Sequence, residues 1–378
     1  MKILHLSDLH LGKRLNGFSL IEDQEHILSE ILKTAAAEKP AVVLICGDIY
    51  DRSVPSEEAV RLFDSFIAAL ASMRIQVFAI AGNHDSAERL AFGASLMNAS
   101  GVHFSPVYDG NLRAFPLTEG GLTVDVFMLP FIRPLGVRRF FPDEEIESYT
   151  DAVRCAAGAA ERSESRVSIL MAHQFVTGSA TCDSEEKLAG GLDNADASAF
   201  EGFDYVALGH LHGPQFVGPD KKIRYCGTPL KYSFSEASHE KSVTVLEIES
   251  KDRINVRTVP LVPKRDMREL RGTYAQLVSR ENYEGTATED YIRVTLTDEE
   301  EVPEVMSRLR VIYPNIMELR YDNGRTRESA AIKAAEAAET KTPAEYLAEF
   351  YEKQNNVPLS EGQRQLAERL LAAMEREA

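Results

Sequence analysis

Five short apolar runs of this chain each end directly in Asp, Asn or His residues. The runs are KILHLS, AVVLICG, IQVFAIAG, VSILMAH and YVALGH. Amphipathic stretches with helical spacing separate the first three, and this alternation is typical of an α/β fold. Ligands of α/β sheets bind beyond the carboxyl ends of the strands. We therefore predict that the polar clusters that follow these runs converge on one crevice.

The clusters contain side chains that bind metals. An isolated histidine after a strand is most often a hydrogen-bonded loop residue, and His5 is predicted to be such a residue in the core, but a set of clusters in register argues against that interpretation. Carboxylate, imidazole and amide donors without thiolate suit Mn²⁺ better than a structural zinc. So many donors fit two ions that share a carboxylate, as in displacement at phosphorus, with Asp48 on the central strand as the natural bridge. The predicted ligands are Asp8, His10, Asp48, Asn83, His173, His210 and His212.

Composition limits the partners and the compartment. The 378 residues include 59 acidic and 42 basic side chains, a net charge of -17, which argues mildly against a general coater of DNA. Bases close to the clusters are therefore the candidates for phosphate contacts, namely Lys13, Arg14 and Arg52. The four cysteines lack C-x-x-C spacing, and no apolar run is long enough to span a membrane. We expect a cytoplasmic protein without a membrane segment.

Changes in composition divide the chain into three predicted parts. Residues 1–262 form the α/β part, and a proline-containing basic linker leads to a β-α-β block over 268–325 that suits a small α+β capping domain. An Ala-rich stretch precedes two capped helices within 341–378, which begin at Thr342 and Ser360. Their bulky apolar stripes are too large for so small a hairpin to bury, which predicts docking into the groove of a partner.

The order of the clusters resembles a known family. D-x-H, G-D-x-x-D, G-N-H-D, a single H and G-H-x-H are the motifs of the calcineurin-like metallophosphoesterases. The resemblance implies a β-sandwich of two sheets flanked by helices. It also implies one ion on Asp8, His10, Asp48 and His212, and another on Asp48, Asn83, His173 and His210. His84 would face the scissile phosphate without binding metal, Asp85 would orient its ring, and Asp51 would lie behind the ligands.

Within that superfamily, three segments are similar to the bacterial SbcD nuclease subunits: HLSDLHLGKR, GDIYDRSVPSEEA and PLVPKRDMRELRG. This resemblance implies a DNA repair nuclease that uses two Mn²⁺ ions, or less favourably Mg²⁺. Its substrates would be double-stranded and single-stranded DNA without sequence preference. The expected assembly is a homodimer within a heterotetramer with the SbcC ATPase, where the capping domain contacts DNA and the C-terminal helices dock the ATPase.

Two other functions remain open from the residues alone. A small-molecule phosphodiesterase or a phosphoprotein phosphatase would use the same metals, and GDIYDR resembles the G-D-x-V-D-R-G motif of phosphatases. However, Ser53 replaces the final glycine and GNHD stands where those enzymes have GNHE. Such an enzyme also gives no reason for the residues after 262. A structural adaptor with a degenerate site is the other alternative, and the intact motifs argue against it.

Overall fold

The computed structural model describes residues 1–185 and 194–324, together with 351, 359–360, 362–364 and 366. It divides into two compact units. The first comprises Met1–Leu270, Val278–Val294 and Met306–Leu319, and the second comprises Arg271–Leu277, Thr295–Val305 and Arg320–Ala378. The predicted domain boundaries at 262, 268, 325 and 341 stay a prediction.

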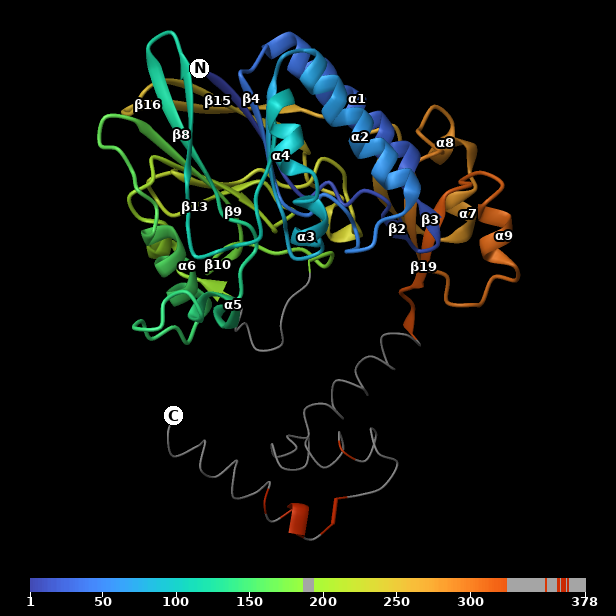
Figure 1. Cartoon of the computed structure of the whole chain (residues 1–378). Coiled ribbons are helices and arrows are strands. Elements are labelled where there is room, and N and C mark those ends of the chain that lie inside the picture. Colours follow the sequence, from blue (N-terminus) through green and yellow to red (C-terminus); the bar gives the residue numbers. More distant parts are fainter. Residues whose placement is uncertain (186–193, 325–350, 352–358, 361, 365, 367–378) are drawn as a thin grey trace. The chain divides into compact units, whose positions relative to one another are not determined.

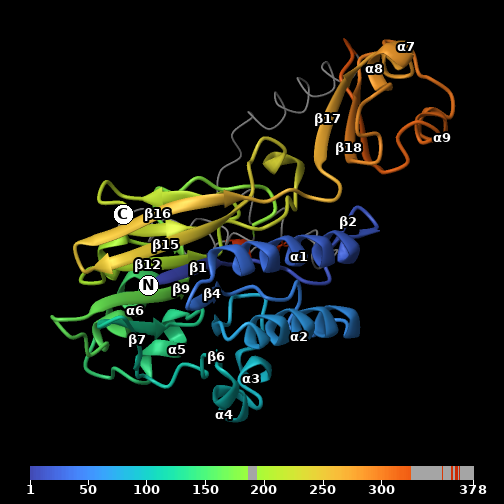
Figure 2. The same cartoon turned by 90° about the horizontal axis from the view of Figure 1, so that it is seen from above.

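One six-stranded sheet carries the first three clusters (Figures 1 and 2). Strands β1, β4, β5 and the edge strand β6 run parallel, and β15 pairs antiparallel with both β1 and the other edge strand, β16. In sheet order the strands are β16 (Arg253–Pro260), β15 (Ser242–Ser250), β1 (Lys2–Leu6), β4 (Val42–Cys46), β5 (Gln76–Ile80) and β6 (Val102–Phe104).

A second six-stranded sheet carries the remaining two clusters. Its strands β8, β9, β12 and β14 run parallel, and β7 and β13 are antiparallel edges. In sheet order the strands are β13 (Gln215–Val217), β14 (Ile223–Tyr225), β12 (Tyr205–Gly209), β9 (Val167–His173), β8 (Leu122–Met128) and β7 (Ala114–Glu119).

The two sheets face each other across an apolar layer. Leu44 and Phe78 of the first sheet and Met171 of the second belong to one buried cluster. Helices α1 (Ile21–Glu38) and α2 (Glu57–Ser72) pack on the outer side of the first sheet, where Phe63 and Leu70 of α2 are buried with strand residues. Helix α6 (Tyr149–Gly158) packs in a separate cluster with the second sheet. The predicted sandwich of two sheets flanked by helices is confirmed.

Local sequence accounts for the position of α2. A serine before Glu57 and Glu58 is a sequence pattern that predicts a helix start, and the Ser56 hydroxyl accepts a hydrogen bond from the Ala59 N–H at 3.3 Å, so Ser56 caps the helix. Glu57 and Glu58 occupy the first turn, where negative side chains favour the helix dipole. Because α2 begins only at Glu57 and β4 ends at Cys46, the chain between them forms the loop that carries Asp48.

The block after residue 262 has the predicted β-α-β order. Strands β17 (Met267–Gly272), β18 (Tyr291–Leu296) and β19 (Ile316–Tyr321) form one sheet in that order. The sequence EVPEVMSRLRVIY over 301–313 predicts the helix of this block, but α9 covers only Val305–Leu309. Two further short helices are α7 (Tyr274–Leu277) and α8 (Arg280–Tyr283).

Short elements complete the described chain. The strands are β2 (Arg14–Leu15), β3 (Phe18–Ser19), β10 (Phe175–Val176) and β11 (Asn194–Ala195). The helices are α3 (Ala87–Leu90), α4 (Ala94–Met97), α5 (Pro134–Arg138), η1 (Asn98–Ser100), η2 (Ala197–Phe200) and η3 (Phe234–Glu236). Throughout the described residues, every helix is too short or too polar to traverse a lipid bilayer.

Most of the predicted helical pair over 341–378, including its start at Thr342, lies outside the described residues. The second predicted cap can be examined. The Ser360 N–H donates to Oε1 of Gln363 at 2.9 Å, and the Gln363 N–H donates back to the Ser360 hydroxyl at 3.4 Å. The reciprocal capping box predicted at this position is therefore confirmed.

Candidate active site

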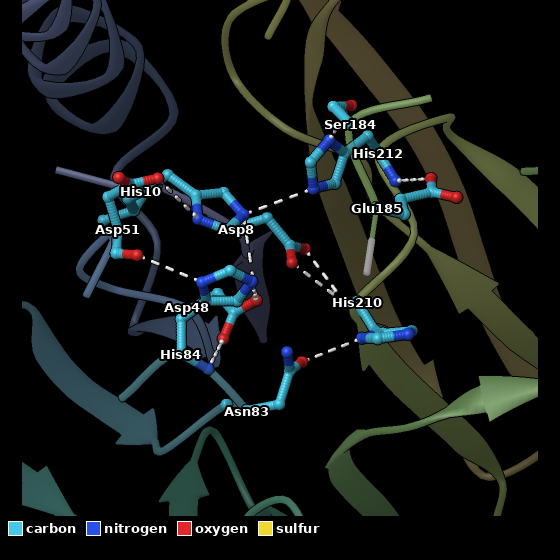
Figure 3. Close-up of polar contacts among 12 residues, drawn as sticks. Asp8, His10, Asp48, Asp51, Asn83, His84, Ser184, Glu185, His210 and His212 are labelled. Carbon is cyan, nitrogen blue, oxygen red and sulfur yellow. Dashed lines mark hydrogen bonds and ion pairs between the residues drawn. The ribbon is translucent and has the colours of Figure 1, made fainter. Parts of the chain in front are cut away.

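Loops at the carboxyl ends of five parallel strands bring the predicted ligands together (Figure 3). Asp8 and His10 follow β1, Asp48 follows β4, and Asn83 follows β5, all in the first sheet. From the second sheet, β9 ends in His173, and β12 leads into His210 and His212. The proposed ligands thus lie where the loops of the two sheets meet, and each sheet supplies a part of the site.

The turns that carry these residues are unusual. Asp8, His10 and Asp48 have positive φ angles of 53°, 43° and 49°, a conformation that costs energy for residues other than glycine. Such strain is often found at functional sites, where the surrounding structure holds it in place. A Cβ atom on Gly82 would lie 2.1 Å from Oδ1 of Asp48, so glycine is required there for the two loops to approach.

Asp48 lies among three imidazoles. Its Oδ2 atom is 3.3 Å from Nε2 of His173, 3.7 Å from Nε2 of His10 and 3.9 Å from Nε2 of His84. The other oxygen, Oδ1, accepts the backbone N–H of His84 at 2.9 Å. This central position agrees with the bridging role predicted for Asp48.

The amide of Asn83 joins the two histidines of the second predicted ion. Its Oδ1 atom is 3.0 Å from Nε2 of His173 and 3.0 Å from Nδ1 of His210. Both oxygens of Asp8 accept the backbone N–H of His210, at 3.0 and 3.1 Å. All the predicted ligands therefore contact at least one other member of the set.

Ligand atoms within 4.8 Å of one another form three groups among the described residues: Asp8 with His10 and His212, Asp8 with Asp48 and His173, and His10 with Asp48 and His84. Oxygen and imidazole donors this close suit borderline or hard divalent cations. The first group matches the first predicted ion, and the second group joins ligands of both ions. The third includes His84, which was predicted not to bind metal. The residues fit a pair of cations.

Burial and neighbouring charges shift the pKa values of the Asp48 and Asp8 carboxyl groups in opposite directions. Burial opposes the charge on Asp48, but the neighbouring imidazoles, first His173 and then His10 and His84, together outweigh it and hold the Asp48 pKa well below its ordinary value. Burial raises the pKa of Asp8 to about 6. Burial lowers the pKa of His173, but the charge and hydrogen bond of Asp48, together with the charge of Asp8, outweigh burial and raise this pKa to about 9. A buried site that holds protons in this way is one where a cation can replace them.

His84 is positioned through the backbone. Its Nδ1 atom bonds the carbonyl oxygen of Asp51 at 3.0 Å. The Asp85 carboxylate instead accepts the N–H groups of Gly82, Ile49 and Tyr50 at 3.0–3.1 Å. The prediction that Asp85 orients the ring directly is therefore corrected. Asp85 joins the loop after β4 to the loop after β5 because its carboxylate accepts backbone N–H groups from both.

The bases proposed for DNA contacts differ in their surroundings. Lys13 is bound to Asp51, with Nζ 2.7 Å from Oδ1, and Asp51 lies behind the ligands, 3.9 Å from Nδ1 of His10. Arg14 donates to the carbonyl of Gly17 and is exposed. The side chain of Arg52 is 80% exposed. His5 is buried against Tyr205 and the carbonyl of Leu208, so its predicted place in the core is confirmed.

Four residues beside His212 were not predicted from the sequence. Ser184, Glu185, Glu236 and Lys241 contact this histidine or one another. Glu236 ends the short helix η3, the other three belong to irregular segments, and no motif spacing marks any of them. The one signal in the sequence is the S-E pair that occurs in both segments, and it is too common to be informative.

The fold and the oxygen and imidazole cluster define a metallophosphoesterase, and comparison with known families agrees. Residues 1–214 match the family described as calcineurin-like phosphoesterase. Residues 263–355 match the domain family SbcD_C, described as type 5 capsule protein repressor C-terminal domain. Among solved structures, a dimetal phosphatase from Danio rerio is 12% identical, with a TM-score of 0.40 over 70% of this chain and 98% of that chain.

Two curated relatives cover most of the chain. The SbcD subunit of the SbcCD nuclease of Staphylococcus epidermidis is 36% identical over 323 residues, which span 84% of this chain and 85% of the relative. The protein of the same name from Staphylococcus saprophyticus is 35% identical over 84% of both chains. The chain therefore belongs to the calcineurin-like phosphoesterase family and, within it, to the group of SbcD nuclease subunits.

Proposed function

We propose that this chain is the nuclease subunit of a complex of the SbcC–SbcD type, a metal-dependent hydrolase of DNA phosphodiester bonds. The observation that carries the proposal is the close approach of seven side chains. They are the buried carboxylates of Asp8 and Asp48, four imidazoles and the amide of Asn83. The relatives that share this chain over 84% of its length are named as nuclease subunits. Double-stranded and single-stranded DNA are the proposed substrates, without sequence preference.

The proposed cofactor is a pair of Mn²⁺ ions, with Mg²⁺ as the less favoured occupant. Asp8, His10, Asp48 and His212 would hold one ion, and Asp48, Asn83, His173 and His210 would hold the other. When bound, such a pair supplies Lewis-acid polarisation of the phosphate and an activated water. The chain itself orients the ligands: Nδ1 of His173 donates to the carbonyl of Cys46 at 2.8 Å, which turns Nε2 toward Asp48.

His84 is the proposed catalytic residue. Because a carbonyl can only accept, the bond to Asp51 places a proton on Nδ1 of His84. Its Nε2 atom then holds or releases the proton that the leaving oxygen needs. Asp85 is a proposed positioning residue that keeps the Asn83–His84 loop against the β4 loop through backbone N–H groups.

Contacts to DNA are proposed for Arg52, Arg14 and Lys13. Arg52 and Arg14 are exposed and can reach a phosphate, whereas Lys13 would have to exchange its bond to Asp51 for one. None of them belongs to a motif that reads bases, so sequence-independent binding is expected. The block over 268–325 is proposed as a further DNA-contacting domain.

The proposed assembly is a homodimer within a heterotetramer with the SbcC ATPase. Phe92 and Leu96, beside and within α4, are 84% and 81% exposed, and such apolar exposure is typical of an interface. Residues 341–378 are proposed to dock the ATPase. The four cysteines, Cys46, Cys155, Cys182 and Cys226, are free thiols, which suits the proposed cytoplasmic location.

One comparison of substrates tests the proposed function. Purified protein with Mn²⁺ is incubated with end-labelled duplex DNA, a p-nitrophenyl phosphodiester and a phosphopeptide. We expect degradation of the DNA at rates far above turnover of the other two, and loss of degradation with EDTA. Preferred turnover of the ester or the phosphopeptide would favour the small-molecule phosphodiesterase or the phosphatase. No turnover of any substrate with Mn²⁺ bound would favour the adaptor.

A further inference from the structure

A chain of polar side chains begins at Nδ1 of His212, the ring nitrogen that does not face His10, and Figure 3 shows its first member, Ser184, beside His212. Nδ1 of His212 is 2.7 Å from the hydroxyl oxygen of Ser184. The same hydroxyl is 2.6 Å from Oε1 of Glu236, and Oε2 of Glu236 is 2.5 Å from Nζ of Lys241. Glu236 and Lys241 are 0% and 5% exposed, so this ion pair is excluded from water.

The chemistry of the members sets the direction of every bond. Lys241 is a donor only, and its three protons reach Glu236, the Thr228 hydroxyl at 2.7 Å and the His212 carbonyl at 2.9 Å. The Glu236 carboxylate, ionised by this partner, can only accept, so the Ser184 hydroxyl donates to it. The oxygen of Ser184 then accepts, and the remaining donor is the Nδ1–H of His212.

The backbone of His212 is fixed from the same loop. Glu185 accepts the His212 N–H at 2.7 Å and the Cys182 N–H at 2.8 Å. The Asp183 N–H donates to the Ser235 hydroxyl at 3.0 Å, which attaches this loop to the segment that carries Glu236. The loop over 182–185 therefore holds both the ring and the main chain of His212.

The other histidines of the proposed ligand set lack such a chain in the described part of the protein. Nδ1 of His173 donates to the backbone carbonyl of Cys46, which no side-chain change can remove. Nδ1 of His10 is buried without a hydrogen-bond partner in the described part of the chain, and the nearest carboxylate is that of Asp51 at 3.9 Å. Nδ1 of His210 lies 3.0 Å from Oδ1 of Asn83, which is itself a proposed ligand. Among these four histidines of the described chain, His212 is thus the one whose Nδ1 contacts a side chain outside the proposed ligand set within hydrogen-bond distance.

We infer that Ser184, Glu236 and Lys241 are positioning residues that hold His212 as its Nδ1–H tautomer, so that the lone pair of Nε2 is directed to the ion shared with His10. This inference rests on the proposed metal centre. It predicts that one of the two ions depends on the chain of bonds and the other does not. Loss of such a partner typically weakens a metal site by about 10- to 100-fold.

The test compares Ser184→Ala, Ser184→Thr and the matched control Ser235→Ala in the full-length protein. Calorimetric titration with Mn²⁺ measures the two sites. We expect Ser184→Ala to weaken one site about 10- to 100-fold with the other unchanged, and Ser184→Thr to restore it because it keeps the hydroxyl. Ser235→Ala removes one backbone contact of this loop but leaves the bonds of Ser184 and Glu185 to His212, so it measures the effect of a loosened loop, and its loss of Mn²⁺ affinity should be clearly smaller than that of Ser184→Ala.

The second measurement reads the tautomer without metal or activity. Side-chain ¹⁵N shifts of labelled histidine, assigned by the loss of one signal in His212→Gln, should show the Nδ1–H form of His212 in the metal-free wild type and a mixture in Ser184→Ala. An Nε2–H form in the wild type, or equal losses of Mn²⁺ affinity in Ser184→Ala and Ser235→Ala, would overturn the inference. If the wild type binds no Mn²⁺, the proposed function fails, and the ¹⁵N shifts still test the bond.

Discussion

The Nε2 atoms of His10 and His212 lie 3.2 Å apart, although one residue follows a strand of the first sheet and the other a strand of the second. Two nitrogens that each lie about 2.1 Å from one ion in adjacent positions are separated by roughly this distance. The pair therefore marks a place where the two sheets contribute to one proposed ligand set. The following predictions test that set and the residues around it.

Removal of the central carboxylate should disable the metal centre. In Asp48→Ala, we expect loss of at least one Mn²⁺ ion and of all DNA hydrolysis, because Asp48 is the one ligand proposed for both ions. Calorimetric titration measures the ions, and far-UV circular dichroism verifies the fold. Asp252→Ala removes an exposed carboxylate and should leave both sites intact. Two undiminished sites in Asp48→Ala would refute the bridging role.

His84→Ala separates chemistry from metal binding. The variant should keep both ions and lose about 10²- to 10⁴-fold in the rate of DNA hydrolysis, the usual effect of losing a general acid or base. Single-turnover rates and Mn²⁺ titrations are measured on the same preparation. Loss of an ion together with activity would instead show that His84 is a ligand in the group it forms with His10 and Asp48.

Asp85→Asn should affect stability as well as rate. The carboxylate accepts three backbone N–H groups from two loops, and an amide can replace only part of these bonds. Because hydrogen bonds to charged groups contribute about 1.5–3 kcal/mol each, we expect the free energy of unfolding to fall by a few kcal/mol. Urea denaturation measures this loss. An unchanged urea midpoint would contradict the role of Asp85 in joining the loops.

Bound metal should stabilise the fold. A ligand that binds only the folded state at 100 times its dissociation constant adds about 2.7 kcal/mol. We therefore expect EDTA to lower the melting temperature of the wild type and excess Mn²⁺ to restore it. Asp48→Ala should respond weakly to both treatments. A wild-type melting temperature that ignores EDTA and Mn²⁺ would argue against a preformed metal centre.

The free energy of unfolding should depend on pH because of His5, a buried histidine outside the proposed ligand set. Burial, together with the charge of Arg224, lowers the pKa of His5 to about 3. Below its ordinary pKa of about 6.5, His5 gains a proton in the unfolded chain and not in the folded one, so acid favours unfolding until the pH falls to about 3.

This linkage gives a measurable difference between variants. From pH 7 to pH 5 the wild type should lose about 2 kcal/mol more stability than His5→Gln, which has no imidazole to protonate. Urea midpoints at both values of pH test this. The control His26→Gln removes a partly exposed histidine of α1. Equal losses in the wild type and His5→Gln would show that His5 does not contribute.

The proximity of the proposed ligands could be predicted from sequence because each member lies next to a strand end, and strand ends are visible in short apolar runs. Asp8, Asn83 and His173 were found in this way, and parallel strands bring their carboxyl ends together without further information. The Ser56 cap of α2 was predictable for the same reason, since its bond joins residues three positions apart.

Tertiary structure alone decided how the ligands are held. Ser184 meets Glu236 across 52 positions, and His210 meets Asp8 across 202, so no local spacing records either contact. The orientation of His84 was decided in the same way, because its ring bonds the backbone carbonyl of Asp51. Every residue has a backbone carbonyl, so this contact leaves no signal in the sequence. Sequence thus determined which donor side chains follow the strand ends, because the type of a residue and its distance from a strand can be read from the neighbouring sequence. Long-range packing decided their tautomers and orientations, because those depend on which distant atom occupies the remaining hydrogen-bonding position.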